Sequence, residues 1–294
     1  MPAPPSSPLL SVGLPVYNGA SLLRRAIDSV LGQDFTNLEL IISDNASTDA
    51  TPDIAYEYAA ADARVRYIRR PENRGAIDNF GNVLAHAHGR MFSWISHDDS
   101  YDHPDHLSRL AQKIDEGMTL AFPEVRAVYF DDEGNRDRSD AGMLAAFRDI
   151  RTRHQLIREA VRRPSVQIFG LYRTEKLRQY FPMMIEDADM LCFFEGRFVQ
   201  AMLLHEPWAY VPEAQISIGQ HSSNVSRRQD PRRVLRDYVS YSARALALYR
   251  RDRRLTFSER LTGCLETVRV HGPFAARLLG SVIKQRLRSP FASL

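Results

Sequence analysis

The sequence predicts an α/β protein with a Rossmann-like, mostly parallel central sheet that is flanked by helices and followed by a C-terminal helical extension. Two observations predict this class. Short apolar runs alternate with helical patterns through the first hundred residues, which is typical of βαβ units. After about residue 225 the pattern is helical throughout. We expect a main domain over 1–225, with halves at about 8–105 and 106–225, and a basic helical region over 226–294.

Four strands and three helices are expected in the first hundred residues. The helices are a repeat from Leu22 to Leu31, a helix that begins near Thr51, and a helix from about Ala76 to Ala87. Thr51 suits the N-cap of the second helix, because Pro52 then occupies the first helical position. The expected strands are Leu9–Val16, Leu38–Ile42, Val65–Ile68 and Met91–Ile95.

The rest of the chain has fewer clear signals. A strand from Ala127 to Phe130 leads into an acidic, glycine-containing stretch at 131–135, which predicts a hairpin turn. The tail is expected to form helices over about 230–251, 256–270 and 273–288.

Composition narrows the class of protein. Of the 294 residues, 44% are hydrophobic and 26% charged, which excludes a disordered or fibrous chain. Two cysteines, Cys192 and Cys264, are too few for a disulfide framework or a four-cysteine metal site. The first residues lack the pattern of a signal peptide, and no apolar run approaches the roughly 20 residues that span a bilayer. We therefore expect a cytoplasmic protein with reduced thiols.

The formal net charge of +3 is distributed unevenly. Residues 225–294 carry 15 arginines and one lysine against five acidic residues, whereas the preceding part is acidic. Such a tail suits peripheral contact with the inner face of a membrane, contact between two copies of the chain, or packing on the acidic body. Few aromatic residues stand among the arginines and no reader motif is present, which argues against a nucleic-acid partner.

Polar residues follow each of the four expected strands. They are Tyr17-Asn18, Asp44-Asn45, Asn73-Arg74 and His97-Asp98-Asp99. Because the carboxyl ends of parallel strands lie at one edge of a sheet, these clusters are expected to form one site for a polar, anionic ligand with a metal. Neither G-x-G-x-x-G nor G-x-x-x-x-G-K-[ST] occurs, which argues against a Rossmann dehydrogenase and a P-loop enzyme.

Five stretches in order resemble the family 2 glycosyltransferases of the GT-A fold. They are S-V-G-L-P-V-Y-N-G (11–19), L-E-L-I-I-S-D-N-A-S-T-D (38–49), N-R-G-A-I-D-N-F-G-N (73–82), W-I-S-H-D-D-S (94–100) and M-I-E-D-A-D-M-L (184–191). The resemblance covers roughly residues 8–225 and is most specific in the first hundred.

The resemblance implies transfer of a sugar, with inversion at the anomeric carbon, from a nucleoside diphosphate sugar to a hydroxyl group. Uridine is the default base, and the acceptor is a glycan, a lipid-linked substrate or a small molecule. The residues implied in donor binding are Pro15, Val16, Tyr17, Asp44, Asn45, Arg74, Gly75, Asn79 and His97, with Asp78 as an alternative to Asn79. From the residues alone, Tyr17-Asn18 also fits a turn and Asp44 an Asx-turn or helix cap.

The resemblance also implies a divalent metal, Mn²⁺ or Mg²⁺. The family's D-x-D motif corresponds here to Ser96-His97-Asp98, so Ser96 replaces the first aspartate. Asp98 is the first candidate for a metal ligand, Asp99 the second, and His221 a third ligand. A metal with carboxylate ligands would neutralise a departing diphosphate. The alternative is that the carboxylates cap a helix that starts near Pro104.

The E-D-A-D stretch at 186–189 is expected to open a helix. The resemblance implies that Asp187 is the general base that takes the proton of the acceptor hydroxyl, with Asp189 as the second choice. Glu186, Asp189 and Gly170 are assigned to the acceptor side. The alternative is that these acidic residues stabilise a helix N-terminus.

Two other functions are consistent with parts of the sequence. A sugar nucleotidyltransferase would share the fold, but the phosphate-binding glycine-rich loop is missing. A non-catalytic module with a decayed sugar-nucleotide site and a docking tail is consistent with Ser96.

Overall fold

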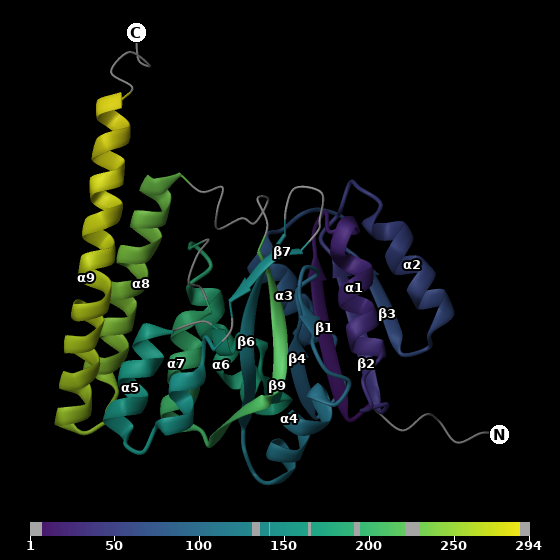
Figure 1. Ribbon diagram of the computed structural model, residues 1–294, viewed down its shortest axis with the longest axis horizontal. Coiled ribbons are helices and arrows are strands. Elements are labelled where there is room, and N and C mark those ends of the chain that lie inside the picture. The colour runs from purple at the N-terminus through teal and green to yellow at the C-terminus, as the bar shows by residue number, and fades with distance from the viewer. Residues whose placement is uncertain are drawn as a thin grey trace. The chain divides into compact units, whose positions relative to one another are not determined.

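The computed structural model (Figure 1) describes most of the chain. Three features expected from the sequence lie outside the described part: Cys192, the turn at 131–135 and the candidate ligand His221. The described residues are 8–130, 136–140, 142–163, 166–190, 195–220 and 230–288.

The chain forms two compact units that interleave along the sequence. The second unit combines the C-terminal helices with two segments, 149–165 and 183–205, which the sequence analysis assigned to the main domain. The first unit comprises 1–148, 166–182 and 206–221, and the second comprises 149–165, 183–205 and 222–294.

Four parallel strands in the order β3-β2-β1-β4 form one part of the sheet in the first unit. The side chains of β1, β2 and β4 are buried throughout, as expected for continuous apolar runs in a sheet that is covered on both faces. They confirm the expected strands, with shifts of one or two residues at the ends. Their bounds are β1 Leu10–Val16, β2 Leu38–Asp44, β3 Val65–Arg69 and β4 Met91–Trp94.

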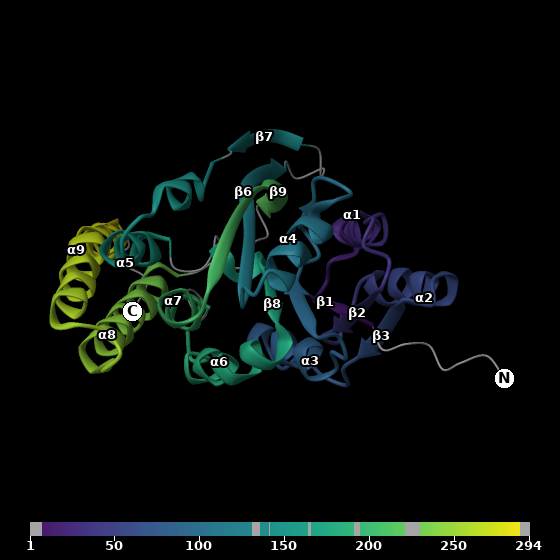
Figure 2. The same cartoon turned by 90° about the horizontal axis from the view of Figure 1, so that it is seen from below.

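Helices cover both faces of these strands. Helices α1 and α2 lie on one face and α3 lies on the other (Figure 2). The chain winds outward from β1 to β3 and then returns to place β4 beside β1, so the winding reverses between β1 and β4. In open α/β sheets ligands bind at the carboxyl ends of the strands beside such a reversal. The bounds are α1 Ala20–Leu31, α2 Thr51–Ala61 and α3 Ala76–Ala85.

Thr51 is the first residue of α2 and is not its N-cap, which is Ala50. The expectation was therefore wrong by one residue. The Thr51 hydroxyl instead accepts a hydrogen bond from the backbone N–H of Gly19 at 3.0 Å. The Thr51 oxygen that was expected to cap α2 thus binds the loop after β1 instead.

The second part of the sheet is mixed. Strand β8 is antiparallel to β4 and to β6, whereas β9 is parallel to β6 and antiparallel to β5. Strands β6 and β7 pair antiparallel across 131–135, as the expected hairpin requires. The bounds are β5 Ser100–Tyr101, β6 Leu120–Phe130, β7 Arg136–Asp140, β8 Leu171–Arg173 and β9 Trp208–Gln220, with α4 at His106–Asp115 and 3-10 helices at Ala145–Asp149 and Val166–Phe169.

The described part of the second unit is helical. Helices α8 and α9 lie side by side along their length (Figure 1). Helix α6 carries the chain from the first unit into the second. One buried cluster consists of Ile157, Val161, Leu204, Tyr249 and Leu255, and a smaller one of Met190, Tyr241 and Ala245. The bounds are α5 Arg153–Arg162, α6 Thr174–Glu186, α7 Gly196–His205, α8 Pro231–Arg251 and α9 Phe257–Arg288.

Helix α9 continues through Pro273, so the expectation of two helices, 256–270 and 273–288, was wrong. Proline in a helix interior costs about 3 kcal/mol, chiefly because one N–H bond is lost and its ring crowds the preceding turn. The carbonyl that loses its partner belongs to Arg269, whose side chain is 71% exposed, so water can take the place of the missing donor. None of the described helices is both long enough and apolar enough to cross a membrane.

Candidate functional site

Strands β1, β2 and β3 end at the same edge of the sheet, with their last residues paired. Val16 pairs with Asp44, and Asp44 pairs with Arg69. The backbone N–H of Asn45 donates to the carbonyl of Val16 at 2.9 Å, and that of Arg70 donates to the carbonyl of Asp44 at 2.8 Å. The expected meeting of the polar clusters at one edge is therefore confirmed for these three strands.

The loop after β1 is held against the loop after β2. Asn18 has a left-handed backbone, with φ of 50°, which asparagine tolerates better than most residues. Its N–H donates to Ser47 Oγ at 2.9 Å, and its Oδ1 accepts from the N–H of Thr48 at 2.8 Å. Pro15 and Val16 are buried at the end of β1, whereas Tyr17 is 45% exposed. The Tyr17 ring is thus available at this edge of the sheet.

Asp44 is fully buried at the end of β2, and both of its carboxylate oxygens have partners. Oδ1 accepts from the N–H of Ser47 at 2.8 Å, three residues along the chain and so one residue farther than in an Asx-turn. Oδ2 accepts from the Tyr67 hydroxyl at 2.8 Å and lies 3.4 Å from Nη1 of Arg69. Burial, reinforced by the bond to Asp44, raises the pKa of Tyr67 well above its usual value. Sequence reasoning missed Tyr67 and Arg69, although their alternation along β3 places them on one face.

Asn45 connects the end of β2 to the loop before α3. Its Nδ2 donates to Asn73 Oδ1 at 2.8 Å and to the carbonyl of Gly75 at 3.1 Å, and its Oδ1 accepts from the N–H of Arg74 at 3.0 Å. Gly75, at φ 85°, supplies the left-handed backbone that begins α3. The Arg74 side chain is 55% exposed, and its Nη1 lies 4.0 Å from Asp78. Asn45 therefore fixes the backbone from which Arg74 projects.

Asn79 lies within the first unit and is 3% exposed. Its Nδ2 donates to the carbonyls of Ser43 at 2.9 Å and Val16 at 3.3 Å, while its Oδ1 accepts from Ser43 Oγ at 2.5 Å. These contacts tie α3 to the ends of β1 and β2. No local pattern in the sequence indicated that the Asn79 side chain would hold the strand ends together.

The segment after β4 carries His97, Asp98 and Asp99. Asp99 is 1% exposed and accepts from the N–H groups of Ser96 at 3.2 Å and Gly219 at 3.0 Å. Burial, followed by the neighbouring charge of Asp98, raises the pKa of Asp99 well above its usual range. Asp99 therefore holds the segment to β9, which leaves Asp98 as the better candidate for contact with a ligand.

Asp98 lies where three segments of the first unit meet. Its carboxylate is 3.9 Å from Nδ1 of His97, and its backbone carbonyl accepts from the guanidinium of Arg25. A Cβ on Gly219 would lie 2.3 Å from that carbonyl, and one on Gly19 would lie 2.5 Å from the His97 ring. Glycine at both positions thus allows β9 and the loop after β1 to approach this segment. Sequence reasoning missed Arg25, which lies on α1 with no motif around it.

The described part of the first unit offers few side chains for a divalent metal. The described residues contain no group of three or more His, Cys, Asp and Glu side chains that could hold a metal ion. Asp98 offers one carboxylate, and Mg²⁺ or Mn²⁺ bound to a diphosphate takes most of its ligands from phosphate and water. A single carboxylate fits a metal that arrives with its nucleotide.

Asp187 lies in the second unit, in the turn after α6. The expectation that E-D-A-D opens a helix was wrong, because α6 ends at Glu186 and the N–H groups of Asp187 and Ala188 donate back to carbonyls of its last turn. A helix C-terminus disfavours carboxylates, so the proposed N-terminal dipole cannot account for these acidic residues. Arginines on other helices instead neutralise the negative charge of these acidic residues.

Arg197 on α7 and Arg244 on α8 hold the two oxygens of Asp187. Arg197 Nε lies 3.0 Å from Oδ2, and Arg244 Nη1 lies 2.7 Å from Oδ1. Asp187 is fully buried. Arg197 also binds Glu186 at 2.6 Å, and Arg244 binds Asp189 at 2.9 Å. Nothing in the local sequence connects Arg244 with a residue 57 positions earlier, so sequence reasoning missed this cluster.

Gly170 lies in the first unit, directly before β8. A Cβ there would lie 2.7 Å from Leu120 Cδ1 and 2.9 Å from the carbonyl of Ala121. The close approach that this glycine permits is therefore to β6 of the protein itself.

The chain is similar to known glycosyltransferases over part of its length. A family model described as glycosyl transferase family 2 matches residues 11–181. An uncharacterized glycosyltransferase of Rickettsia prowazekii is 38% identical over 118 residues, which are 40% of this chain and 36% of that protein. The GalNAc(5)-diNAcBac-PP-undecaprenol beta-1,3-glucosyltransferase of Campylobacter jejuni is 33% identical over 136 residues, 46% of this chain and 43% of that protein. The matches thus span less than half of these relatives.

Solved structures share the fold at low sequence identity. TarS 1–349 of S. aureus in complex with UDP-GlcNAc has a TM-score of 0.64 at 16% identity, over 90% of this chain and 73% of that one. The mannosyltransferase PcManGT of Pyrobaculum calidifontis, in complex with GDP-Man and Mn²⁺, has a TM-score of 0.59 at 16% identity, over 99% and 84%. Both likenesses support the GT-A architecture expected from the sequence.

Proposed function

The chain belongs to glycosyl transferase family 2, and from this premise we propose that it transfers a sugar, with inversion, from a nucleoside diphosphate sugar to a hydroxyl group of its acceptor. One observation carries the donor half of this proposal: the polar residues after β1, β2 and β4 and before α3 adjoin at one edge of the sheet in the first unit. A nucleotide needs such an edge, where aromatic, amide and cationic groups lie together.

The donor is proposed to lie along this edge. Pro15, Val16 and the exposed ring of Tyr17 would contact the base. Asp44 is fully buried, so it would hydrogen-bond the base only after the end of β2 opens. Arg74 and Gly75 would close over the nucleotide, because Asn45 fixes their backbone. His97 would lie near the diphosphate, whereas Asn79 would act by holding the strand ends. Uridine is the default base, which agrees with the UDP-GlcNAc in one structural neighbour, while another holds GDP-Man.

Asp98 is proposed as the protein's carboxylate ligand to Mg²⁺ or Mn²⁺, with His221 as a further ligand. When bound, such a metal would neutralise the charge of the diphosphate leaving group. Asp99 is the second candidate, but its bonds to Ser96 and Gly219 favour a supporting role. The Mn²⁺ present in the complex of a structural neighbour supports this choice of ion.

Asp187 is proposed as the general base, with Asp189 as the alternative. Asp187 is fully buried and each of its oxygens accepts from an arginine, so its surroundings must open before an acceptor hydroxyl can reach a remaining lone pair. Asp189 is 62% exposed and has only Arg244 as a partner among the described residues. If Asp187 is the base, Asp187→Asn should abolish most of the transfer activity. If Asp189 is the base, Asp189→Asn should do so.

The acceptor is proposed to be a glycan, a lipid-linked substrate or a small molecule. A relative that is 33% identical over 136 residues has a name that specifies a PP-undecaprenol-linked substrate, which supports a lipid-linked acceptor here. Such an acceptor would require the enzyme to work at a membrane surface.

The outer face of α9 supports a peripheral membrane contact. Its exposed apolar stripe comprises Phe257, Leu261, Leu265, Val268 and Leu279, each between 47% and 74% exposed. Spacings of 4, 4, 3 and 11 residues place the five on one side of the helix. Exposed apolar patches of this kind mark an interaction surface.

The charges beside the stripe favour an anionic lipid surface as its partner. Arg260 and Arg269 flank it on either side, whereas Glu259 and Glu266 face inward and pair with Arg153 and Arg162. Two copies of this face would bring arginines together, while an anionic membrane would attract them. We therefore propose that α9 lies on anionic lipid.

The proposed function is tested by measuring donor hydrolysis and binding with Mn²⁺. A panel of nucleoside diphosphates and their sugars should raise the melting temperature for one base, because a ligand that binds only the native state stabilises it in proportion to its affinity. The same nucleotide sugar should slowly release its nucleoside diphosphate without an acceptor. A chain that binds none of the panel would contradict the proposal, and one that binds without hydrolysis or transfer would be a non-catalytic module.

A further inference from the structure

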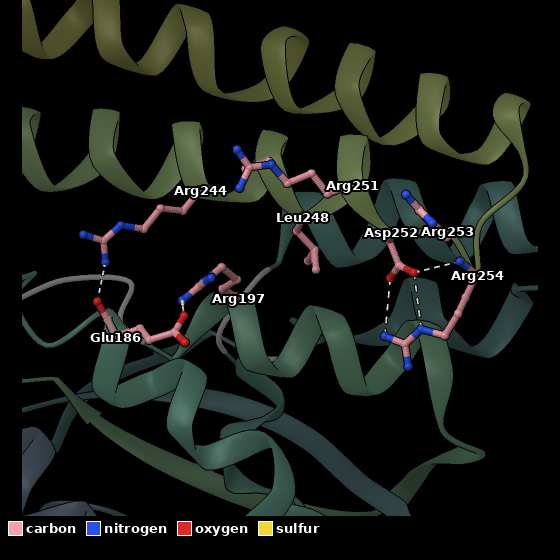
Figure 3. Close-up of a pocket in the computed structure, with 9 residues that line it drawn as sticks. Glu186, Arg197, Arg244, Leu248, Arg251, Asp252, Arg253 and Arg254 are labelled. Carbon is pink, nitrogen blue, oxygen red and sulfur yellow. Dashed lines mark hydrogen bonds and ion pairs between the residues drawn. The ribbon is translucent and has the colours of Figure 1, made fainter.

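The second unit contains a cavity of about 700 Å³ that arginines line (Figure 3). It lies beside the end of α6, α7, the C-terminal part of α8 and the turn that follows α8. Glu186 and Asp252 contribute the acidic groups. The arginines are Arg197, Arg244, Arg251, Arg253 and Arg254. Five guanidinium groups around one cavity point to an anionic ligand.

The spacing of residues along α8 brings its lining residues together. Arg244, Leu248 and Arg251 follow one another by four and three residues, so they lie on one face of the helix. In Figure 3 the Arg251 side chain extends along α8 in the direction of Arg244. The Arg244 side chain extends the same way, as expected for helical side chains that lean toward the N-terminus, so the two guanidinium groups lie one after the other along one side of α8.

The arginines of this arginine pocket differ in how far their charge is compensated. Arg197 and Arg244 hold Asp187, and Arg254 pairs with Asp252 at 3.3 Å. Arg251 and Arg253 are exposed and make no hydrogen bond or ion pair with any residue in the described part of the chain. Two guanidinium groups are therefore available to a ligand without breaking an existing pair.

The arginines and carboxylates that line the pocket together suit a ligand in which a phosphate is attached to a polyol. The guanidinium fork matches the oxygens of phosphate and binds them in pairs. Carboxylates such as that of Glu186 repel phosphate but accept hydrogen bonds from sugar hydroxyls. A volume of about 700 Å³ exceeds what a single phosphate needs and is typical of sites for small organic ligands.

We propose that the arginine pocket binds a phosphate- or diphosphate-linked part of the acceptor. This inference rests on the proposed function, because Arg244 both lines the pocket and holds Asp187, the proposed base. A group bound there would lie one side chain away from Asp187. The pocket would thereby select acceptors that carry phosphate next to the sugar, whether the phosphate is soluble or lipid-borne.

The test measures binding of two probes by calorimetry, at low salt and with a chelator so that no metal contributes. Inorganic pyrophosphate represents a soluble phosphate, and dihexanoyl phosphatidic acid below its micelle concentration represents a lipid-borne one. The variant is Arg251→Gln with Arg253→Gln, two exposed residues whose loss should not affect folding. The matched control is Arg250→Gln, an exposed arginine in the same turn of α8 that does not line the pocket.

We expect wild type and Arg250→Gln to bind at least one probe alike, and the double variant to bind it at least tenfold more weakly. The probe that binds more tightly identifies the source of the phosphate. Equal affinity in the double variant, or no binding of either probe to wild type, would overturn the proposal. Donor hydrolysis with Mn²⁺, measured on the same samples, should be unchanged in the double variant. Absence of donor hydrolysis in wild type would instead contradict the proposed transferase function.

Discussion

Arg244 donates a hydrogen bond from Nη1 to Oδ1 of Asp187 over 2.7 Å, and the carboxylate that it holds is fully buried. Arg197 occupies the other oxygen. Buried charges of this kind persist only with close compensation, and removing one partner typically costs several kcal/mol. Any test of Asp187 as a catalytic group must therefore separate a loss of chemistry from a loss of structure.

The first prediction concerns Asp187→Asn. We expect transfer to fall by about 10²–10⁴, the usual contribution of a general base, while binding of the nucleotide sugar stays close to normal. Asp189→Asn, at an exposed position, should change turnover only a few-fold. Calorimetric donor binding and circular dichroism of both variants report whether the fold is intact. Turnover like that of wild type in Asp187→Asn would contradict its role as the base, and a large loss in Asp189→Asn alone would transfer that role to Asp189.

The second prediction concerns Asp98→Asn. Because this carboxylate is the proposed ligand of a metal that arrives with the diphosphate, we expect Mn²⁺-dependent binding of the nucleotide sugar to weaken at least tenfold. Binding without metal should be unchanged. Asp105→Asn is the control, since Asp105 is a nearby aspartate that pairs with Arg109 at the surface. Calorimetric titrations with and without Mn²⁺ check this, and identical metal dependence in Asp98→Asn and wild type would count against the assignment.

The sequence predicted the first part of the fold well, because β1, β2 and β4 are short apolar runs and α1 and α3 are strongly periodic. Helix α2 is not, and its start was predicted from Thr51 and Pro52. The sequence predicted the rest less well, for two physical reasons. Pro273 signals a break that α9 tolerates at an exposed position. The antiparallel pairing of β8 with β4 and β6 joins segments far apart in the chain, which local periodicity does not report.

The sequence predicted the position of those site residues that directly follow a strand, because the direction of the strand determines at which edge of the sheet they lie. The strand ends bring Asn18, Asp44, Asn45 and Arg74 to one edge because parallel strands share an orientation. The partners of these residues come from other elements and have no local signature. Arg244 is the clearest example, since only tertiary packing brings α8 to Asp187.

The third prediction concerns acid stability. His106 is fully buried, stacks on Tyr101 with ring centroids 4.1 Å apart, and contacts the carbonyl of Gln215 at 2.9 Å. Burial lowers its pKa to about 3, against the effects of that carbonyl and of Asp105, while His103 adds to the lowering. The native state thus binds fewer protons than the unfolded state, and stability is complete above pH 6.5 and is lost as the pH falls toward 3.

The expected contribution of His106 is a loss of about 1.4 kcal/mol of unfolding free energy per pH unit below 6.5. His106→Gln keeps a donor for the carbonyl of Gln215 but does not titrate, so it should flatten that part of the pH dependence. Urea unfolding at a series of pH values between 7 and 4 checks this. An unchanged slope in the variant would show that other groups dominate acid unfolding. His86→Gln, at an exposed position, is the matched control.

The last prediction concerns the apolar stripe on α9. Leu261→Ser with Leu265→Ser should reduce flotation with vesicles that contain anionic phosphatidylglycerol, because each buried CH₂ contributes about 0.8 kcal/mol to lipid binding. Binding should also fall with salt and be weak on neutral phosphatidylcholine, since Arg260 and Arg269 flank the stripe. A control pair, Ser258→Ala with Thr262→Ala, changes polar positions of the same helix. If the chain ignores both kinds of vesicle and light scattering instead gives a dimer that the leucine substitutions dissociate, then a second copy covers this face and the lipid proposal is wrong.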